Sequence, residues 1–170
     1  MKKYRLFALV LVVSIMTTLL LPFQSLALEP PEFHGKNAIL VDANYDEVLY
    51  EVGGHDKVYP ASLTKIMTLL LAVEAVERGD VQLDDTVTAY ADCNADMVEG
   101  ASNADIKVGE TMTFEDFLYC AMISSANEAC NVMAEAVSGD VASFVELMNT
   151  RAAELGMEDT HFSNTHGYHD

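Results

Sequence analysis

The feature that most constrains the fold is a series of apolar segments at helical spacing, most of which end at a glycine. Residues 63–78 stop at Gly79, residues 129–138 stop at Gly139, and residues 141–155 stop at Gly156. Glycine favours the left-handed conformation that closes a helix. A further helix is predicted to begin after Thr113, which can serve as its N-cap. This pattern predicts a mostly helical body, and residues 63–73 are so rich in apolar side chains that we expect their helix to be central and buried.

The strand signals lie mainly before these helices. Residues 38–41 and 48–52 read as an antiparallel hairpin across a turn at residues 42–47 that is rich in Asn and Asp. Residues 87–90 are consistent with one more short strand in an otherwise irregular stretch, residues 81–110. A two-stranded hairpin is marginal alone, so we expect an α+β fold whose antiparallel sheet has further strands. The chain ends without a capping helix or strand, which favours a truncated protein.

The N-terminus is typical of an export signal. Basic residues precede an apolar run over residues 6–22, and Ser25-Leu26-Ala27 has the small-x-small pattern of a cleavage site. We therefore predict a signal peptide over residues 1–27 and one catalytic domain, truncated at its C-terminal end, over residues 28–170. The alternative is an uncleaved membrane anchor. Both interpretations put the working domain outside the cytoplasm.

Charge and cysteine content exclude some classes of protein. The formal net charge is −18, which argues against a nucleic-acid partner because phosphates would be repelled. The three cysteines, Cys93, Cys120 and Cys130, form an odd set that cannot be a complete disulfide framework. Cys120 and Cys130 fall in apolar, helix-like segments, which favours small core residues over metal ligands.

Ser62 and Lys65 form a Ser-x-x-Lys pair at the start of the apolar helix. Residues three apart share a helical face, so the two side chains can meet. A lysine can take the proton of a serine when burial and the helix N-terminus lower its pKa, and the N–H of Ser62 can stabilise an oxyanion. The pair alone is a weak signal, because serine is also a common N-cap.

A second polar group strengthens this interpretation. Ser125 and Asn127 form a Ser-x-Asn motif in a break between two apolar helices, where polar side chains need a function. Ser-x-x-Lys followed by Ser-x-Asn is the order of the first two motifs of penicillin-binding proteins and serine β-lactamases.

Over most of the chain the sequence resembles the low-molecular-mass serine D-alanyl-D-alanine carboxypeptidases. The resemblance is carried by residues 60–68, 107–110, 124–129, 144–149 and 155–164. It implies a penicillin-binding fold in which Ser62 is the nucleophile, Lys65 the general base, Ser125 a proton relay and Asn127 a substrate-binding residue. It implies no cofactor and no metal. The implied partners are peptidoglycan stem peptides ending in D-Ala-D-Ala and, as covalent inhibitors, β-lactam antibiotics.

The sequence also departs from the family pattern. The third motif, Lys-Thr-Gly on a late strand, does not occur in these residues, and a C-terminal segment beyond them could carry membrane association. Glu128 stands where the family has Asp. Thr165 and Tyr168 stand where it favours Pro and Leu.

Three alternatives stay open. A class A β-lactamase would use the same serine and lysine, but residues 146–149 match its Glu-x-x-Leu-Asn element only in part and are more typical of an amphipathic helix. A second alternative is a non-catalytic wall-binding relative. The third is a metal site at His161, His166, His169 and Asp170. Calcium at residues 92–105 is disfavoured by irregular ligand spacing, and we expect a solvated loop there.

Overall fold

The computed structural model describes residues 11, 16 and 29–169. The predicted signal peptide, residues 1–27, falls outside these residues except at positions 11 and 16, so it stays a prediction. None of the helices in the described part of the chain is both long and apolar enough to cross a membrane. The chain divides into two compact units, residues 1–56 and 57–170.

The first unit contains the predicted hairpin. Strand β1 (Ala38–Asp42) pairs antiparallel with β2 (Glu47–Val52), and the register shifts between Leu40 and Val41. Asp46, in the turn, has a φ of 53°, a left-handed conformation that Asp tolerates better than most residues. The hairpin prediction is confirmed.

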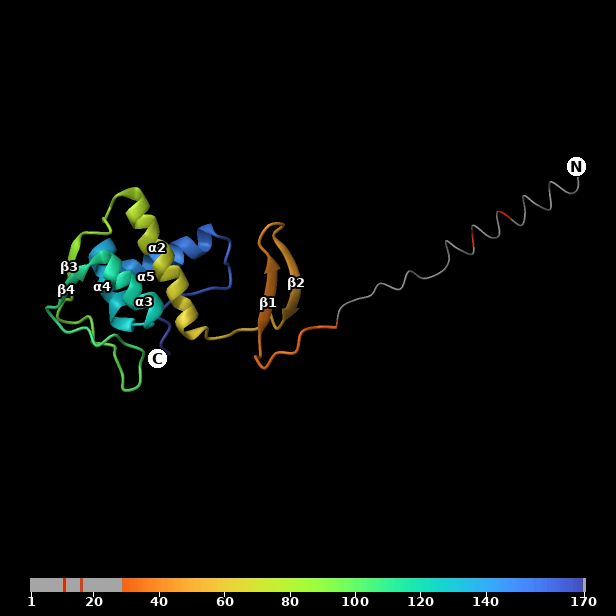
Figure 1. Cartoon of the computed structure of the whole chain (residues 1–170), viewed down its shortest axis with the longest axis horizontal. Coiled ribbons are helices and arrows are strands. Elements are labelled where there is room, and N and C mark those ends of the chain that lie inside the picture. The colour runs from red at the N-terminus through yellow and green to blue at the C-terminus, as the bar shows by residue number, and fades with distance from the viewer. Residues whose placement is uncertain (1–10, 12–15, 17–28, 170) are drawn as a thin grey trace, which may run out of the picture. The chain divides into compact units, whose positions relative to one another are not determined.

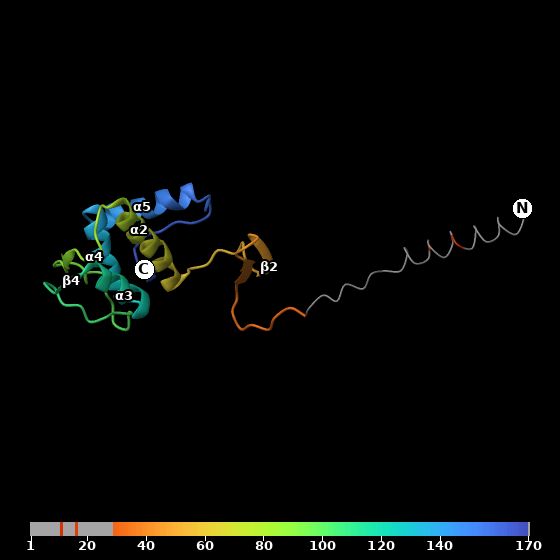
Figure 2. The same ribbon diagram turned by 45° about the horizontal axis from the view of Figure 1, so that its top comes forward.

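The second unit is the helical body (Figures 1 and 2). A 3-10 turn, η1 (Ala61–Thr64), runs directly into helix α2 (Lys65–Arg78). A short antiparallel sheet of β3 (Thr86–Thr88) and β4 (Thr111–Thr113) precedes α3 (Phe114–Ile123), α4 (Asn127–Ser138) and α5 (Val141–Glu154). Helix α4 packs against each of the other three helices, so the residues at its N-terminal end are held on several sides.

The helix ends follow the local sequence signals. Gly79 and Gly139 take left-handed C-cap conformations, with φ of 81° and 85°. Thr113 caps α3, and its hydroxyl accepts the N–H of Asp116 while the Asp116 carboxylate accepts the N–H of Thr113. These predicted boundaries are confirmed because each depends on neighbouring residues alone.

Among the described residues, the core consists of two clusters of buried side chains around α4. One is centred on Phe114, Phe117 and Val132, and the other on Phe144 and Met148. The cysteines are free thiols. Cys130 lies in the first cluster and Cys120 packs against it, which agrees with the predicted role of these two as core residues. Cys93, for which the sequence made no such prediction, is buried in the same cluster.

The prediction that the helix after Ser62 is central and buried holds for only one of its sides. One side of α2 packs against the other helices through Met67, Leu71 and Ala75. On the opposite side, Ile66 is 64% exposed and Val73 is 46% exposed. The density of apolar residues indicates how much of a helix surface is suited to burial, but it does not say which helices or strands are present to cover that surface. Among the described residues of this unit, the expected sheet does not cover that side.

The stretch between α2 and α3 is irregular, as predicted, apart from β3 and β4. Strand β3 overlaps the predicted strand at residues 87–90 but begins one residue earlier and ends two residues earlier. Strand β4 has no counterpart in the prediction because three residues are too few to show an alternating pattern.

Candidate active site

Ser62 lies in the 3-10 turn rather than in the α-helix itself. The residue before it, Ala61, has a φ of 50°, a conformation that costs a non-glycine residue about 1–3 kcal/mol and is commonest at functional sites. The Ser62 side chain caps neither η1 nor α2. Its Oγ instead accepts hydrogen bonds from Lys65 Nζ at 3.2 Å and from Ser125 Oγ at 3.0 Å. The capping interpretation of this serine is therefore wrong.

Lys65 is the buried cation of the site. Its side chain is 4% exposed, and Nζ donates to Ser62 Oγ, to Asn127 Oδ1 at 2.7 Å and to the His166 carbonyl at 3.2 Å. Burial lowers the pKa of Lys65 below the ordinary lysine value, although the Glu128 carboxylate acts in the opposite direction. A lowered pKa is what a lysine needs to accept a proton near neutrality.

Ser125 and Asn127 come from the predicted break between helices. Helix α3 ends at Ile123, and Ser125 takes a left-handed conformation with a φ of 53°. Asn127 then begins α4, and its backbone N–H is held by the Ser102 carbonyl at 3.0 Å. The break thus brings both polar side chains to Ser62 and Lys65, and all four predicted site residues lie together.

The loop at residues 164–168 closes the other side of the lysine. Gly167 has a φ of 77°, and a Cβ atom there would collide with the Ala61 carbonyl. This glycine lets the loop approach the 3-10 turn closely. Thr165, which replaces the family's usual proline, donates its hydroxyl to Asn131 Oδ1 at 2.6 Å, a bond that proline could not make. In both ribbon views the end of this segment lies beside α2 (Figures 1 and 2).

Glu128 is a buried carboxylate that follows Asn127 in α4. Its side chain is 1% exposed, and Oε1 accepts the N–H groups of Ala104 at 2.7 Å and Ile106 at 3.4 Å. These bonds join α4 to the irregular stretch before β4. Its second oxygen, Oε2, has no hydrogen-bond partner in the described structure. The same glutamate therefore anchors a loop and places negative charge near Lys65.

The metal alternative finds no support in the geometry of the histidines. His166 uses both ring nitrogens within the protein, because Nε2 lies 2.8 Å from Asp96 Oδ2 and Nδ1 accepts the N–H of Tyr168 at 3.1 Å. His169 stacks against Tyr59, with ring centroids 4.4 Å apart. The residues with described positions contain no cluster of three or more His, Cys, Asp or Glu side chains that could hold a metal.

The residues that imitate a β-lactamase element have a different role. Glu146 and Asn149 lie in α5, and the Asn149 side chain bonds both the N–H and the carbonyl of Phe162, at 2.8 and 2.9 Å. They form part of an amphipathic helix, as predicted, and Asn149 fastens the segment that follows it.

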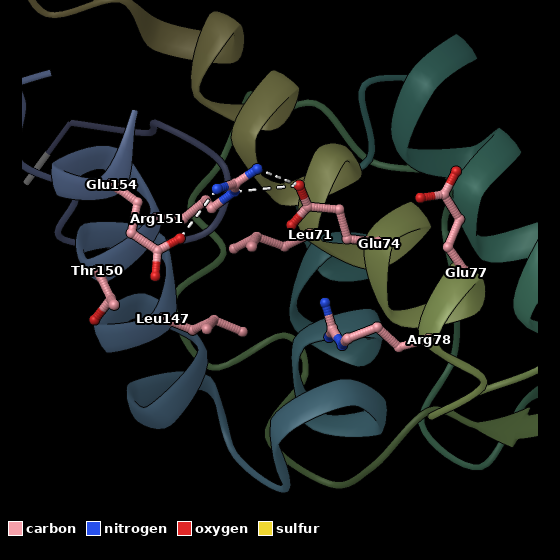
Figure 3. Close-up of a pocket in the computed structure, with 8 residues that line it drawn as sticks. All are labelled: Leu71, Glu74, Glu77, Arg78, Leu147, Thr150, Arg151 and Glu154. Atoms are coloured by element: carbon pink, nitrogen blue, oxygen red, sulfur yellow. Dashed lines mark hydrogen bonds and ion pairs between the residues drawn. The ribbon is translucent and has the colours of Figure 1, made fainter. Parts of the chain in front are cut away.

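A hollow of about 440 Å³ lies away from these residues, between α2 and α5 (Figure 3). Arg151 crosses one side of it and binds Glu74 at 2.8 Å and Glu154 at 3.0 Å. None of the four site residues lines this hollow. Ser62 lies instead on an exposed part of the surface.

Sequence reasoning missed three residues around the loop. Asp96, Asn131 and Thr68 are hydrogen-bonded to one another or to residues 165–166. Asp96 belongs to the acidic stretch that we expected to be a solvated loop, and its side chain is indeed 46% exposed, but its carboxylate also bonds Asn131 and His166. The carboxylates around it gave no local signal that one of them bonds two buried side chains.

Comparisons with known proteins agree with this geometry. Residues 24–170 match peptidase family S11, described as D-alanyl-D-alanine carboxypeptidase. The chain is 39% identical over 132 residues to the D-alanyl-D-alanine carboxypeptidase DacF of Bacillus subtilis, a match that covers 78% of this chain and 33% of DacF. The chain belongs to this peptidase family.

Solved structures show the same fold. Penicillin-binding protein 5 from Haemophilus influenzae matches with a TM-score of 0.79 and 28% identity, covering 85% of this chain and 42% of that protein. Penicillin-binding protein D2 from Listeria monocytogenes, in its ampicillin-bound form, matches with a TM-score of 0.69 and 26% identity, covering 83% and 56%. The penicillin-binding α+β fold is therefore confirmed. The chain spans about a third of the length of the curated relatives it matches.

Proposed function

We propose that this protein is a serine D-alanyl-D-alanine carboxypeptidase that removes the terminal D-alanine from peptidoglycan stem peptides through an acyl-enzyme on Ser62. The observation that carries the proposal is the contact between Ser62 Oγ and a buried lysine amine at 3.2 Å, with Ser125 Oγ at 3.0 Å from the same oxygen. Family membership supports the same reaction.

The acylation step follows from the donors and acceptors around Lys65. A neutral amine has two N–H groups and one lone pair. Asn127 Oδ1 and the His166 carbonyl can accept the two N–H groups, which leaves the lone pair for the Ser62 hydroxyl proton. Ser62 Oγ then bonds to the carbonyl carbon of the penultimate D-alanine, and its proton passes to Lys65.

The leaving group departs as the tetrahedral intermediate collapses. The bond from the carbonyl carbon to the nitrogen of the terminal D-alanine breaks, and that nitrogen needs a proton. Ser125 is proposed to supply it and to recover one from Lys65, because Ser125 Oγ and Lys65 Nζ both lie within hydrogen-bond distance of Ser62 Oγ. Water then cleaves the Ser62 ester and regenerates the hydroxyl. Asn127, besides holding Lys65, is proposed to orient the substrate.

The N–H of Ser62 is proposed to bind the developing oxyanion. The first N–H groups of a helical turn have no acceptor within the turn, and Ser62 is the second residue of η1. Such a donor stabilises negative charge only as it develops on the substrate oxygen, so it lowers the barrier more than it strengthens binding.

The proposed partners and location follow from the same family. The relative solved in its ampicillin-bound form supports β-lactam binding, and the proposed mode of inhibition is acylation of Ser62. Stem peptides ending in D-Ala-D-Ala are the proposed substrates, and the proposed location is outside the cytoplasmic membrane, at the wall. The acidic composition, with a formal charge of −18, would keep an exported protein from binding anionic polymers nonspecifically.

Release of free D-alanine tests the proposal directly. The purified protein, in its longest natural form, is incubated with a peptide ending in D-Ala-D-Ala and with the same peptide ending in L-Ala. We expect D-alanine from the first peptide alone, its loss in Ser62→Ala, and near-normal release in Ser124→Ala, a neighbouring serine that caps α3. Release that survives Ser62→Ala would refute the assignment.

A further inference from the structure

The residue whose carbonyl accepts a hydrogen bond from the proposed catalytic lysine, His166, has a buried imidazole paired with a carboxylate. His166 is 2% exposed, and its Nε2 lies 2.8 Å from Oδ2 of Asp96, whose own side chain is 46% exposed. His166 Nδ1 accepts the backbone N–H of Tyr168, so Nδ1 carries no proton in this arrangement. Nε2 must therefore hold the ring proton and donate it to Asp96, which fixes both the tautomer and the ring orientation.

The second oxygen of Asp96 holds the neighbouring residue of the same loop. Asp96 Oδ1 accepts from Asn131 Nδ2 at 2.9 Å, and Asn131 Oδ1 accepts from the Thr165 hydroxyl at 2.6 Å. Asn131 is itself buried in α4. The Asp96 carboxylate is thus connected to two consecutive residues, to His166 directly and to Thr165 through Asn131.

These two residues turn their carbonyl groups toward α2. The Thr165 carbonyl accepts from the Thr68 hydroxyl at 2.5 Å, and the His166 carbonyl accepts from Lys65 Nζ at 3.2 Å. Since Asn127 Oδ1 takes one N–H of the amine, the position of the His166 carbonyl determines where the remaining lone pair points.

Other side-chain bonds within the loop are local. Asn164 Oδ1 accepts the N–H groups of His166 at 3.2 Å and Gly167 at 2.6 Å, and Asn164 Nδ2 donates to the Tyr168 carbonyl. Bonds of this kind shape a turn but do not fix its distance from a separate helix. The bond between His166 and Asp96 joins residues 70 positions apart in the sequence. It can therefore fix the position of the loop relative to distant parts of the unit.

We propose that Asp96 is a positioning residue, which holds the His166 carbonyl in place and thereby directs Lys65 at Ser62. The inference rests on the proposed function, because it assigns Asp96 a role in the acylation step. Asp96 does not contact the nucleophile. It acts through His166 and Lys65.

Asp96→Asn is the substitution that tests this. Asparagine keeps an oxygen for Asn131 but can place an NH₂ group against the Nε2–H of His166, so two donors face each other. We expect the second-order rate constant for acylation by a labelled penicillin to fall about tenfold, since small misplacements of a catalytic group have effects of this order or larger. Labelling should still reach one adduct per chain.

The pH profile separates positioning from loss of folded protein. The His166 carbonyl stabilises the ammonium form of Lys65, as an acceptor of its N–H, so weakening that contact should move the acid limb of the acylation profile to lower pH. Glu128 and Cys130 also face Lys65 from α4, and neither is changed. A variant that merely folded less well would label a smaller fraction of chains with the acid limb unmoved.

Two further variants complete the test. Asp92→Asn makes the same charge change in the same acidic stretch, at an exposed residue that is not a partner of His166, and should acylate like the wild type. Asp96→Glu keeps the carboxylate and should recover part of the lost rate.

The inference is overturned if Asp96→Asn acylates at the wild-type rate with an unchanged acid limb. It is overturned equally if only the labelled fraction falls. If the wild-type protein forms no adduct, the proposed function is refuted, and this inference fails with it. If the wild type forms an adduct and Asp96→Asn forms it equally fast, only this inference is refuted.

Discussion

Asn127→Ala is expected to slow acylation of Ser62 by about tenfold to a hundredfold. Asn127 Oδ1 accepts from Lys65 Nζ at 2.7 Å, the shortest of the three hydrogen bonds that the amine makes. Lys65 is buried, so water cannot readily replace the lost acceptor. A hydrogen bond to a charged group contributes about 1.5–3 kcal/mol, and each 1.36 kcal/mol corresponds to a factor of ten in rate.

The assay is the rate of covalent labelling by a fluorescent penicillin, measured under pseudo-first-order conditions at several penicillin concentrations. Asn149→Ala is the matched control, because Asn149 also has a hydrogen-bonded side chain but fastens Phe162 rather than Lys65. We expect this control to lose thermal stability and to keep its acylation rate constant. A rate constant for Asn127→Ala within twofold of the wild type would refute the argument that Asn127 orients the amine.

Two further predictions concern charge and packing. In Glu128→Gln, loss of the carboxylate that opposes the lowered pKa of Lys65 should move the acid limb of penicillin acylation to lower pH, and a shift to higher pH would contradict the assigned electrostatics. Phe144→Ala, at a fully buried side chain, should lower the free energy of unfolding by about 3–5 kcal/mol. Urea denaturation measures this loss, and Leu155→Ala, at an exposed residue, should change stability far less.

The parts of the site that could be predicted are those fixed by local geometry. Ser62 and Lys65 are three residues apart, so helical geometry alone brings them together. Ser125 and Asn127 stood out because polar residues interrupted two apolar helices. In the structure this interruption contains the left-handed Ser125, with its φ of 53°, and places Ser125 against Ser62 and Asn127 against Lys65.

The parts that could not be predicted depend on contacts between distant segments. Asp96 lies among several similar acidic residues, and its partner His166 is 70 positions away. No spacing rule singles out one carboxylate from such a stretch. The exposed side of α2 was missed for a related reason, since the apolar residues of a helix do not specify what packs against them.

The most direct test of the account is the intact mass of the protein, in its longest natural form, after exposure to penicillin. We predict a single adduct of one penicillin mass, located on the peptide that contains Ser62 and absent from Ser62→Ala. No adduct on a folded protein, or an adduct that persists in Ser62→Ala, would contradict the assignment of Ser62 as the acylated nucleophile.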